Sequence, residues 1–205
     1  MNRAALLTVA VGVIALTGCK KKEEPFEILQ APVPAAALQR YWQVPDFSLT
    51  ERTGQTVTAA DLRGKVWIAD FFYTTCPGPC PMMTSRLSEI HKATGSEKEL
   101  SLVSISTDPA KDTPEVLKQY AERFGADERW LFLTGQKEAI FQLANKGFKL
   151  SVTDEGGTER EPVTHSTKLV LVDRNGMVRG FYDAQAAYEI KQLIGDAERL
   201  LKESR

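Results

Sequence analysis

The pattern of apolar and polar residues predicts a chain in which strands alternate with helices. Apolar runs with β spacing predict strands over 44–49, 66–73, 100–106, 130–133, 167–173 and 177–182. Helical spacing of apolar residues predicts helices over 81–94, 113–124, 136–146 and 187–204. Asn175 and Gly176 predict a hairpin turn, and Gly156 and Gly157 indicate a second, polar hairpin at the surface. This order predicts an α/β fold with a mixed central sheet, helices on both faces and an inserted hairpin.

The most apolar strand, 66–73, leads directly to Cys76 and Cys80, which are separated by a Pro-Gly-Pro turn. Pro81 suits the first turn of a helix, where its missing N–H breaks no hydrogen bond. The thiols are therefore expected at or just before a helix N-terminus, which favours the thiolate form. A cysteine motif at the end of an early strand suggests a thioredoxin-like arrangement.

The first 18 residues predict a signal peptide, with Arg3 before an apolar run that ends at Leu16. The segment 16–19, Leu-Thr-Gly-Cys, resembles the cleavage box of bacterial lipoproteins, which implies that Cys19 carries the lipid. The alternative is a plain anchor with an incidental cysteine. Residues 19–38 contain three prolines and much alanine and charge, which predicts a flexible linker before a folded domain over 39–205.

Composition narrows the possible partners and metals. The 205 residues have a formal net charge of −1 and no basic block interleaved with aromatic residues, which argues against nucleic acid. An export signal places the domain outside the cytoplasm, on the periplasmic side of a bacterial membrane, where dithiols can oxidise. Three cysteines and two histidines leave few residues for a metal site.

The cysteine motif and three later segments resemble the Sco (SenC-type) family of copper-binding assembly proteins for cytochrome c oxidase. The segments are 108–114, 130–135 and 165–166, and the resemblance extends over about residues 40–203. It implies a thioredoxin-like fold and one copper ion held by Cys76, Cys80 and His165. It also implies a partner, either the copper-bearing subunit of the oxidase or another copper chaperone.

The chemistry of these residue types agrees with copper. Two thiolates and one imidazole form a soft donor set that suits Cu(I) or Cu(II), with zinc as a competitor. The other histidine, His91, is 11 residues beyond Cys80, about 16 Å along a helix, and is too far to share a metal. We expect His91 to be an exposed helix residue.

One position departs from the family pattern. Many members have an acidic residue directly before the histidine, and this chain has Thr164. The group that would orient the imidazole therefore stays open among Asp70, Asp108 and Asp112.

Two other functions use the same dithiol. A thiol–disulfide oxidoreductase would reduce partner cysteines with Cys76 and Cys80 alone, and a redox sensor would report oxidant by the same pair. Both differ from the copper hypothesis because disulfide exchange needs no imidazole ligand.

Overall fold

The computed structural model describes residues 37–95, 97–159 and 161–203, and the compact unit that they form begins at Ala37. The predicted signal peptide, Cys19 and the linker up to residue 36 lie outside the described residues. No helix in the described part of the chain is long and apolar enough to cross a membrane.

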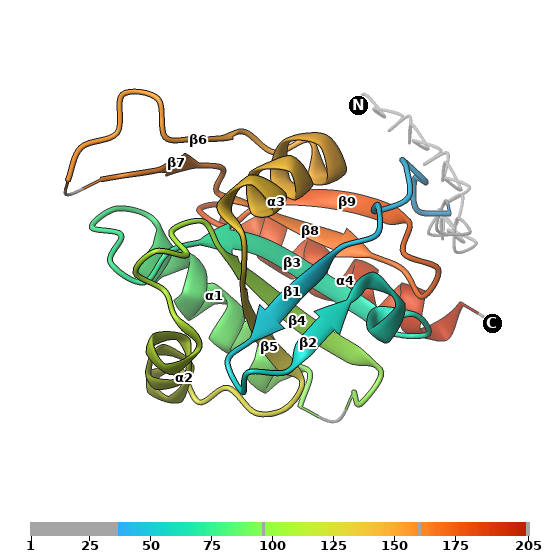
Figure 1. The fold of residues 1–205 in the computed structure, drawn as a ribbon. Helices are drawn as coiled ribbons and strands as arrows, with labels where there is room; N and C mark the ends of the chain where they lie inside the picture. The colour runs from blue at the N-terminus through green and yellow to red at the C-terminus, as the bar shows by residue number, and fades with distance from the viewer. Residues whose placement is uncertain (1–36, 96, 160, 204–205) are drawn as a thin grey trace, which may run out of the picture. The chain divides into compact units, whose positions relative to one another are not determined.

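A mixed sheet of seven strands forms the centre of the domain (Figure 1). Its order is β2-β1-β5-β4-β3-β8-β9, where β3, β4 and β5 are parallel and each of the other neighbouring pairs is antiparallel. The strands are β1 (Ser48–Glu51), β2 (Thr56–Thr58), β3 (Val66–Phe72), β4 (Leu100–Ser106), β5 (Trp130–Thr134), β8 (Lys168–Val172) and β9 (Val178–Asp183). Both β3 and β4 are buried along their whole length. β3 is apolar at every position except Asp70, as is typical of a strand covered on both faces, whereas β4 includes three buried serines.

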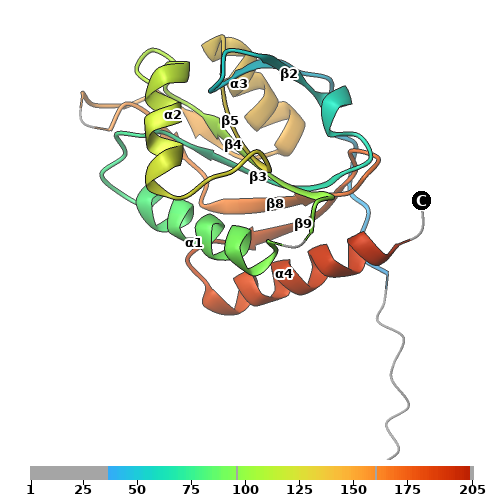
Figure 2. The same ribbon diagram turned by 90° about the horizontal axis from the view of Figure 1, so that it is seen from below.

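Helices cover both faces of this sheet. They are η1 (Ala59–Leu62), α1 (Cys80–Ala93), α2 (Pro114–Arg123), α3 (Lys137–Gln142), the π-helical segment η2 (Leu143–Phe148) and α4 (Ala187–Lys202). On β3, Phe72 packs against Tyr120 of α2, whereas Trp67 and Phe71 pack against Phe148 of η2. Figure 2 shows α1 and α4 on one side of the sheet and α3 on the other. The predicted α/β fold with a mixed sheet and helices on both faces is therefore confirmed.

The chain forms two hairpins after α3, where the turn residues predicted them. Gly176, at a φ of +78°, turns the chain between β8 and β9. The inserted hairpin pairs β6 (Val152–Thr153) with β7 (Thr164–His165), apart from the main sheet. Figure 1 places this hairpin near the turn that precedes α1. The helix predicted over 136–146 differs, because it widens into the π-helical η2 and ends at the left-handed Lys149.

Candidate metal centre

The two cysteines lie on the turn that leaves the carboxyl end of β3. Cys76 donates its N–H to the Tyr73 carbonyl at 3.3 Å, and Cys80 is the first residue of α1. Pro81 occupies the first helical turn, as predicted. Both cysteines are free thiols; Cys76 is 8% exposed and Cys80 is 0% exposed. The turn therefore presents one thiol towards solvent and covers the other.

Asp112 holds this turn against the neighbouring strand. Its carboxylate accepts hydrogen bonds from the N–H and the hydroxyl of Thr74 and from the hydroxyl of Ser106, the last residue of β4. Burial raises the pKa of Asp112, and the hydrogen bonds from Ser106 and Thr74 oppose that rise. Asp112 thus fixes the segment that carries the thiols.

His165, on β7, brings an imidazole to the thiols from the inserted hairpin. Its Nε2 lies 2.8 Å from the Cys80 Sγ, and the ligand atoms of Cys76, Cys80 and His165 all lie within 4.8 Å of one another. The other ring nitrogen, Nδ1, lies 3.0 Å from the Ser166 carbonyl oxygen. A carbonyl oxygen only accepts, so Nδ1 carries the proton and Nε2 presents its lone pair to the sulfurs.

Burial sets the protonation of this pair. It raises the pKa of the Cys80 thiol far above its ordinary range. It also lowers the pKa of His165, against the opposing effect of the Ser166 carbonyl. The Cys80 thiol therefore donates its proton towards His165 Nε2. The helix N-terminus was expected to favour the thiolate, but the pKa of Cys80 is shifted in the opposite direction, with desolvation as the largest cause.

The imidazole Nδ1 pairs with the Ser166 carbonyl and not with any of the three acidic candidates. Asp108 lies 3.7 Å from the Lys111 ammonium, and Asp112 binds the cysteine turn. Asp70 is buried in β3, and neither of its oxygens has a hydrogen-bond partner in the described part of the chain. Burial raises the pKa of Asp70 to about 7.

His91 stands outside the site, as expected from its distance along α1, but the expectation that it is exposed is wrong. It is 6% exposed, and its ring packs against Trp130 with centroids 5.7 Å apart. Its Nε2 lies 2.8 Å from Asp127 Oδ1. Residues 80, 84, 87 and 91 share the helix face that packs on the sheet, which explains the burial.

A solvent-open cleft of about 230 Å³ lies in front of the centre. Tyr73, Cys76, Pro79, Glu161 and His165 are among its lining residues. The Tyr73 ring meets the imidazole edge-to-face, with centroids 5.7 Å apart. A small ligand therefore reaches Cys76 and His165 from this cleft, whereas Cys80 lies behind them.

Sequence reasoning missed two groups that orient His165. Tyr73 stands three residues before Cys76 at the end of an apolar strand, a position that could have indicated a ring beside the site. The Ser166 carbonyl left no signal, because every residue carries one.

Comparison with known proteins identifies the family. The sequence model of the SCO1/SenC family matches residues 36–202. The chain belongs to the SCO1/SenC family. A SCO1 protein homolog of Bacillus subtilis is 31% identical over 160 residues, which cover 77% of this chain and 82% of that protein.

Solved structures of Sco proteins share the fold. A SCO1/SenC family lipoprotein from Bacillus anthracis has a TM-score of 0.73 at 34% identity, over 78% of this chain and 96% of that one. BsSco, described as a cytochrome c oxidase assembly protein with a disulfide switch, gives 0.70 at 30% identity, over 80% and 95%. ScoI of Bradyrhizobium japonicum, solved with copper bound, gives 0.65 at 26% identity, over 77% and 99%. The thioredoxin-like, Sco-type fold predicted from the sequence is confirmed.

Proposed function

We propose that this chain binds one copper ion through Cys76, Cys80 and His165 and delivers it during assembly of the copper centre of cytochrome c oxidase. The observation that carries the proposal is the meeting of two thiols and one imidazole within 4.8 Å, from two distant segments of the chain. The copper-bound structure of the Bradyrhizobium relative and the assembly role described for BsSco support it.

The donor set fits copper as a cargo. Thiolates and imidazole are ligands that Cu(I) and Cu(II) both accept. Because Cys80 is a protonated thiol, loading the ion releases a proton from its sulfur. His165 needs no proton change, since its Nε2 lone pair already faces the sulfurs. The partner, the oxidase subunit or another copper chaperone, would reach the ion through the cleft at Cys76.

The mature chain would work at a membrane surface on the periplasmic side. The lipoprotein-like box at Cys19 supports this part of the proposal, as does the lipoprotein description of the Bacillus anthracis relative. A lipid at Cys19 would tether the domain through the segment 20–36, while leaving Cys76 and Cys80 as the functional thiols.

A second function, thiol–disulfide exchange, is favoured by the unequal exposure of the two thiols. The thiol of Cys76 borders the cleft, and the thiol of Cys80 is fully covered, an arrangement that suits an attacking and a resolving cysteine. The same pair could serve as a redox sensor. A disulfide uses both sulfurs, so it excludes copper and makes the two states alternate.

The variant His165→Ala separates copper delivery from thiol exchange. It removes the nitrogen ligand that Cu(II) favours, so we expect Cu(II) affinity to fall by about 100-fold or more. The reduction potential of the Cys76–Cys80 pair should shift little. In cells, the oxidase should lack copper. The readouts are Cu(II) titration, dithiol potential and oxidase activity in one variant.

The matched control is His91→Gln, which removes the other imidazole and leaves the centre intact. It should keep Cu(II) affinity and oxidase activity. Unchanged Cu(II) binding and full oxidase activity in His165→Ala would reject the copper proposal and leave the dithiol function.

A further inference from the structure

A second cavity, of about 370 Å³, lies at the end of the domain away from the thiols. Its polar lining consists mainly of Arg40, Arg63, Arg174, Asp173, Asn175 and Glu203. We call it the arginine pocket. Three guanidinium groups around one cavity suit an anion, because arginine binds phosphate and carboxylate through two parallel hydrogen bonds.

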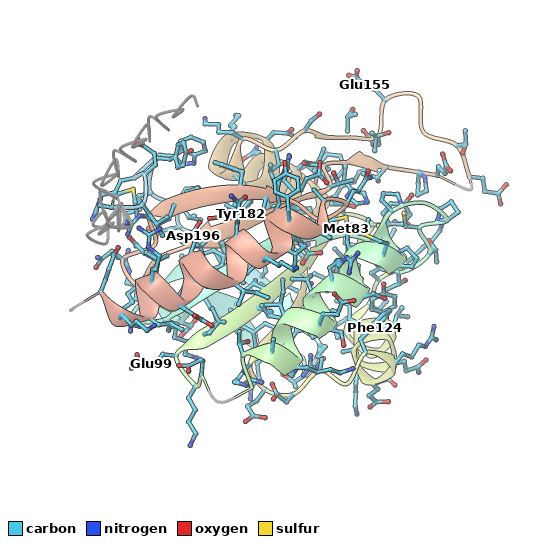
Figure 3. All side chains as sticks on the ribbon, turned by 180° about the vertical axis from the view of Figure 1, so that it is seen from behind. Met83, Glu99, Phe124, Glu155, Tyr182 and Asp196 are labelled. Carbon is cyan, nitrogen blue, oxygen red and sulfur yellow. The ribbon has the colours of Figure 1, made fainter. Side chains whose placement is uncertain are left out.

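The arginine pocket and the thiols lie at opposite ends of β3. Gly64, in the pocket wall, comes before β3, and Cys76 comes after it. A strand of this length separates its ends by about 20 Å. Figure 3 shows the same separation: Glu155, in the hairpin beside the cleft, and Glu99, the ion-pair partner of Arg174, lie at opposite ends of the molecule.

Hydrogen bonds hold the pocket segments in fixed positions. The buried Arg179 donates to the carbonyls of Leu38 and Gln39 at 3.0 and 3.1 Å, directly before Arg40. The Gly64 N–H, next to Arg63, donates to the Arg174 carbonyl at 2.8 Å. The chain that carries each arginine is therefore in place before any ligand binds.

The pocket has more guanidinium groups than acidic partners. Arg174 pairs with Glu99 at 2.8 Å, and Arg179 beneath the pocket pairs with Asp173 and Glu203 at 2.9 and 3.1 Å. Arg40 and Arg63 are exposed, and neither side chain has a carboxylate partner within the described residues. The acidic residues of the lining are thus neutralised, and two cations remain for an outside anion.

We propose that the arginine pocket binds a phosphate group, carried by an anionic lipid headgroup or free in solution. The lipid source rests on the proposed function, because the segment that would carry the lipid enters the domain at Ala37, three residues before Arg40. Cys19 and Arg40 are 21 residues apart, which allows a reach of up to about 75 Å. Because the pocket and the thiols lie at opposite ends of β3, a lipid headgroup bound in the pocket would orient the thiols away from the bilayer and towards a partner.

The test uses residues 37–205, which form a compact unit and lack both Cys19 and the lysines at 20–22 that would themselves attract anionic lipid. The probes are phosphatidylglycerol vesicles, phosphatidylcholine vesicles and inorganic phosphate. The double variant Arg40→Gln with Arg63→Gln removes the two unpaired cations. The control, Lys92→Gln with Arg123→Gln, removes the same charge from the surface at the ends of α1 and α2.

We expect the domain to bind phosphatidylglycerol vesicles and not phosphatidylcholine vesicles. The arginine double variant should bind them about thirtyfold more weakly, and the control variant should lose little. Binding of inorganic phosphate alone, with the same dependence on the arginines, supports the pocket and assigns it to a free anion. Equal losses in both variants, or binding of neither probe, would overturn the proposal. Copper is absent from every arm, so these outcomes leave the copper function untouched.

Discussion

The two histidines lie near opposite ends of α1, and their neighbours give them different roles. His165 comes from β7 and lies beside Cys80, the first residue of the helix. Its Nε2 faces the Cys80 sulfur, and its Nδ1 is held by the Ser166 carbonyl. At the last turn, His91 directs Nε2 at the carboxylate of Asp127 and stacks on Trp130. Each ring is largely shielded, so burial alone does not distinguish them.

The hydrogen-bond partners make the distinction. The Asp127 carboxylate lies 2.8 Å from His91 Nε2, and Arg129 Nη2 lies 3.1 Å from the same nitrogen, so protein groups already occupy it. A carbonyl on His165 Nδ1 leaves the other nitrogen as an acceptor, which a metal can use. A histidine is therefore a credible ligand when its second nitrogen is already committed elsewhere.

The largest expected effect comes from removing the covered thiol. Cys80→Ser keeps the size and a hydrogen-bonding group beside His165 but replaces a soft ligand by a hard one. We expect Cu(I) affinity to fall by more than the roughly 100-fold that losing an orienting group costs. Competition with a Cu(I) chelator measures it.

Met83→Leu is the control for that change. It removes a neighbouring buried sulfur on α1 at nearly constant volume. Its Cu(I) affinity should match that of the unchanged chain. If Cys80→Ser kept its Cu(I) affinity within threefold of the unchanged chain, on the order of measurement scatter, Cys80 would not be a ligand.

The two histidine sites differ in how far the sequence alone could predict them. The spacing of Cys76 and Cys80 and the strand before them were enough to predict the fold. The resemblance of the later segments to the Sco family was needed to place His165 with the thiols. The protonation of Cys80 was not predictable, because it depends on how completely the hairpin and helix cover the sulfur. The burial of His91 was predictable, since the helical spacing already placed it on the face of Cys80.

A second prediction concerns stability at the His91 end of the helix. His91→Gln loses the contact with Trp130 and weakens the hydrogen bond to Asp127. Burial raises the pKa of Asp127, but the hydrogen bonds from His91 and Arg129 outweigh it and keep that pKa low. We expect the free energy of unfolding to fall by about 2 kcal/mol, as for a hydrogen bond to a charged group.

Urea unfolding of the metal-free protein measures this loss, and His165→Gln is the matched comparison. The hydrogen-bond partners of His165 are an uncharged thiol and a carbonyl, whereas His91 pairs with a carboxylate, so replacing His165 should cost less stability than replacing His91. A greater loss in His165→Gln would mean that the imidazole of the candidate centre is the structural one of the two.

The smallest expected effect comes from Asp70, which lies on β3 and lacks the kind of partner that Asp127 has. Its pKa in the folded chain, about 7, lies above the ordinary value of 3.8. Between pH 5 and 6 the folded chain keeps this proton and the unfolded chain has lost it. Raising the pH therefore favours unfolding, by about 1.4 kcal/mol over that unit.

Asp70→Asn is neutral at every pH and nearly the same size, so it should remove this part of the pH dependence. We expect its stability relative to the unchanged chain to increase between pH 5 and pH 6, in urea unfolding at both values. Asp46→Asn, at an exposed position, is the control and should keep the original slope. If Asp70→Asn also kept that slope, the carboxyl would titrate alike in both states, and its burial would not control its charge.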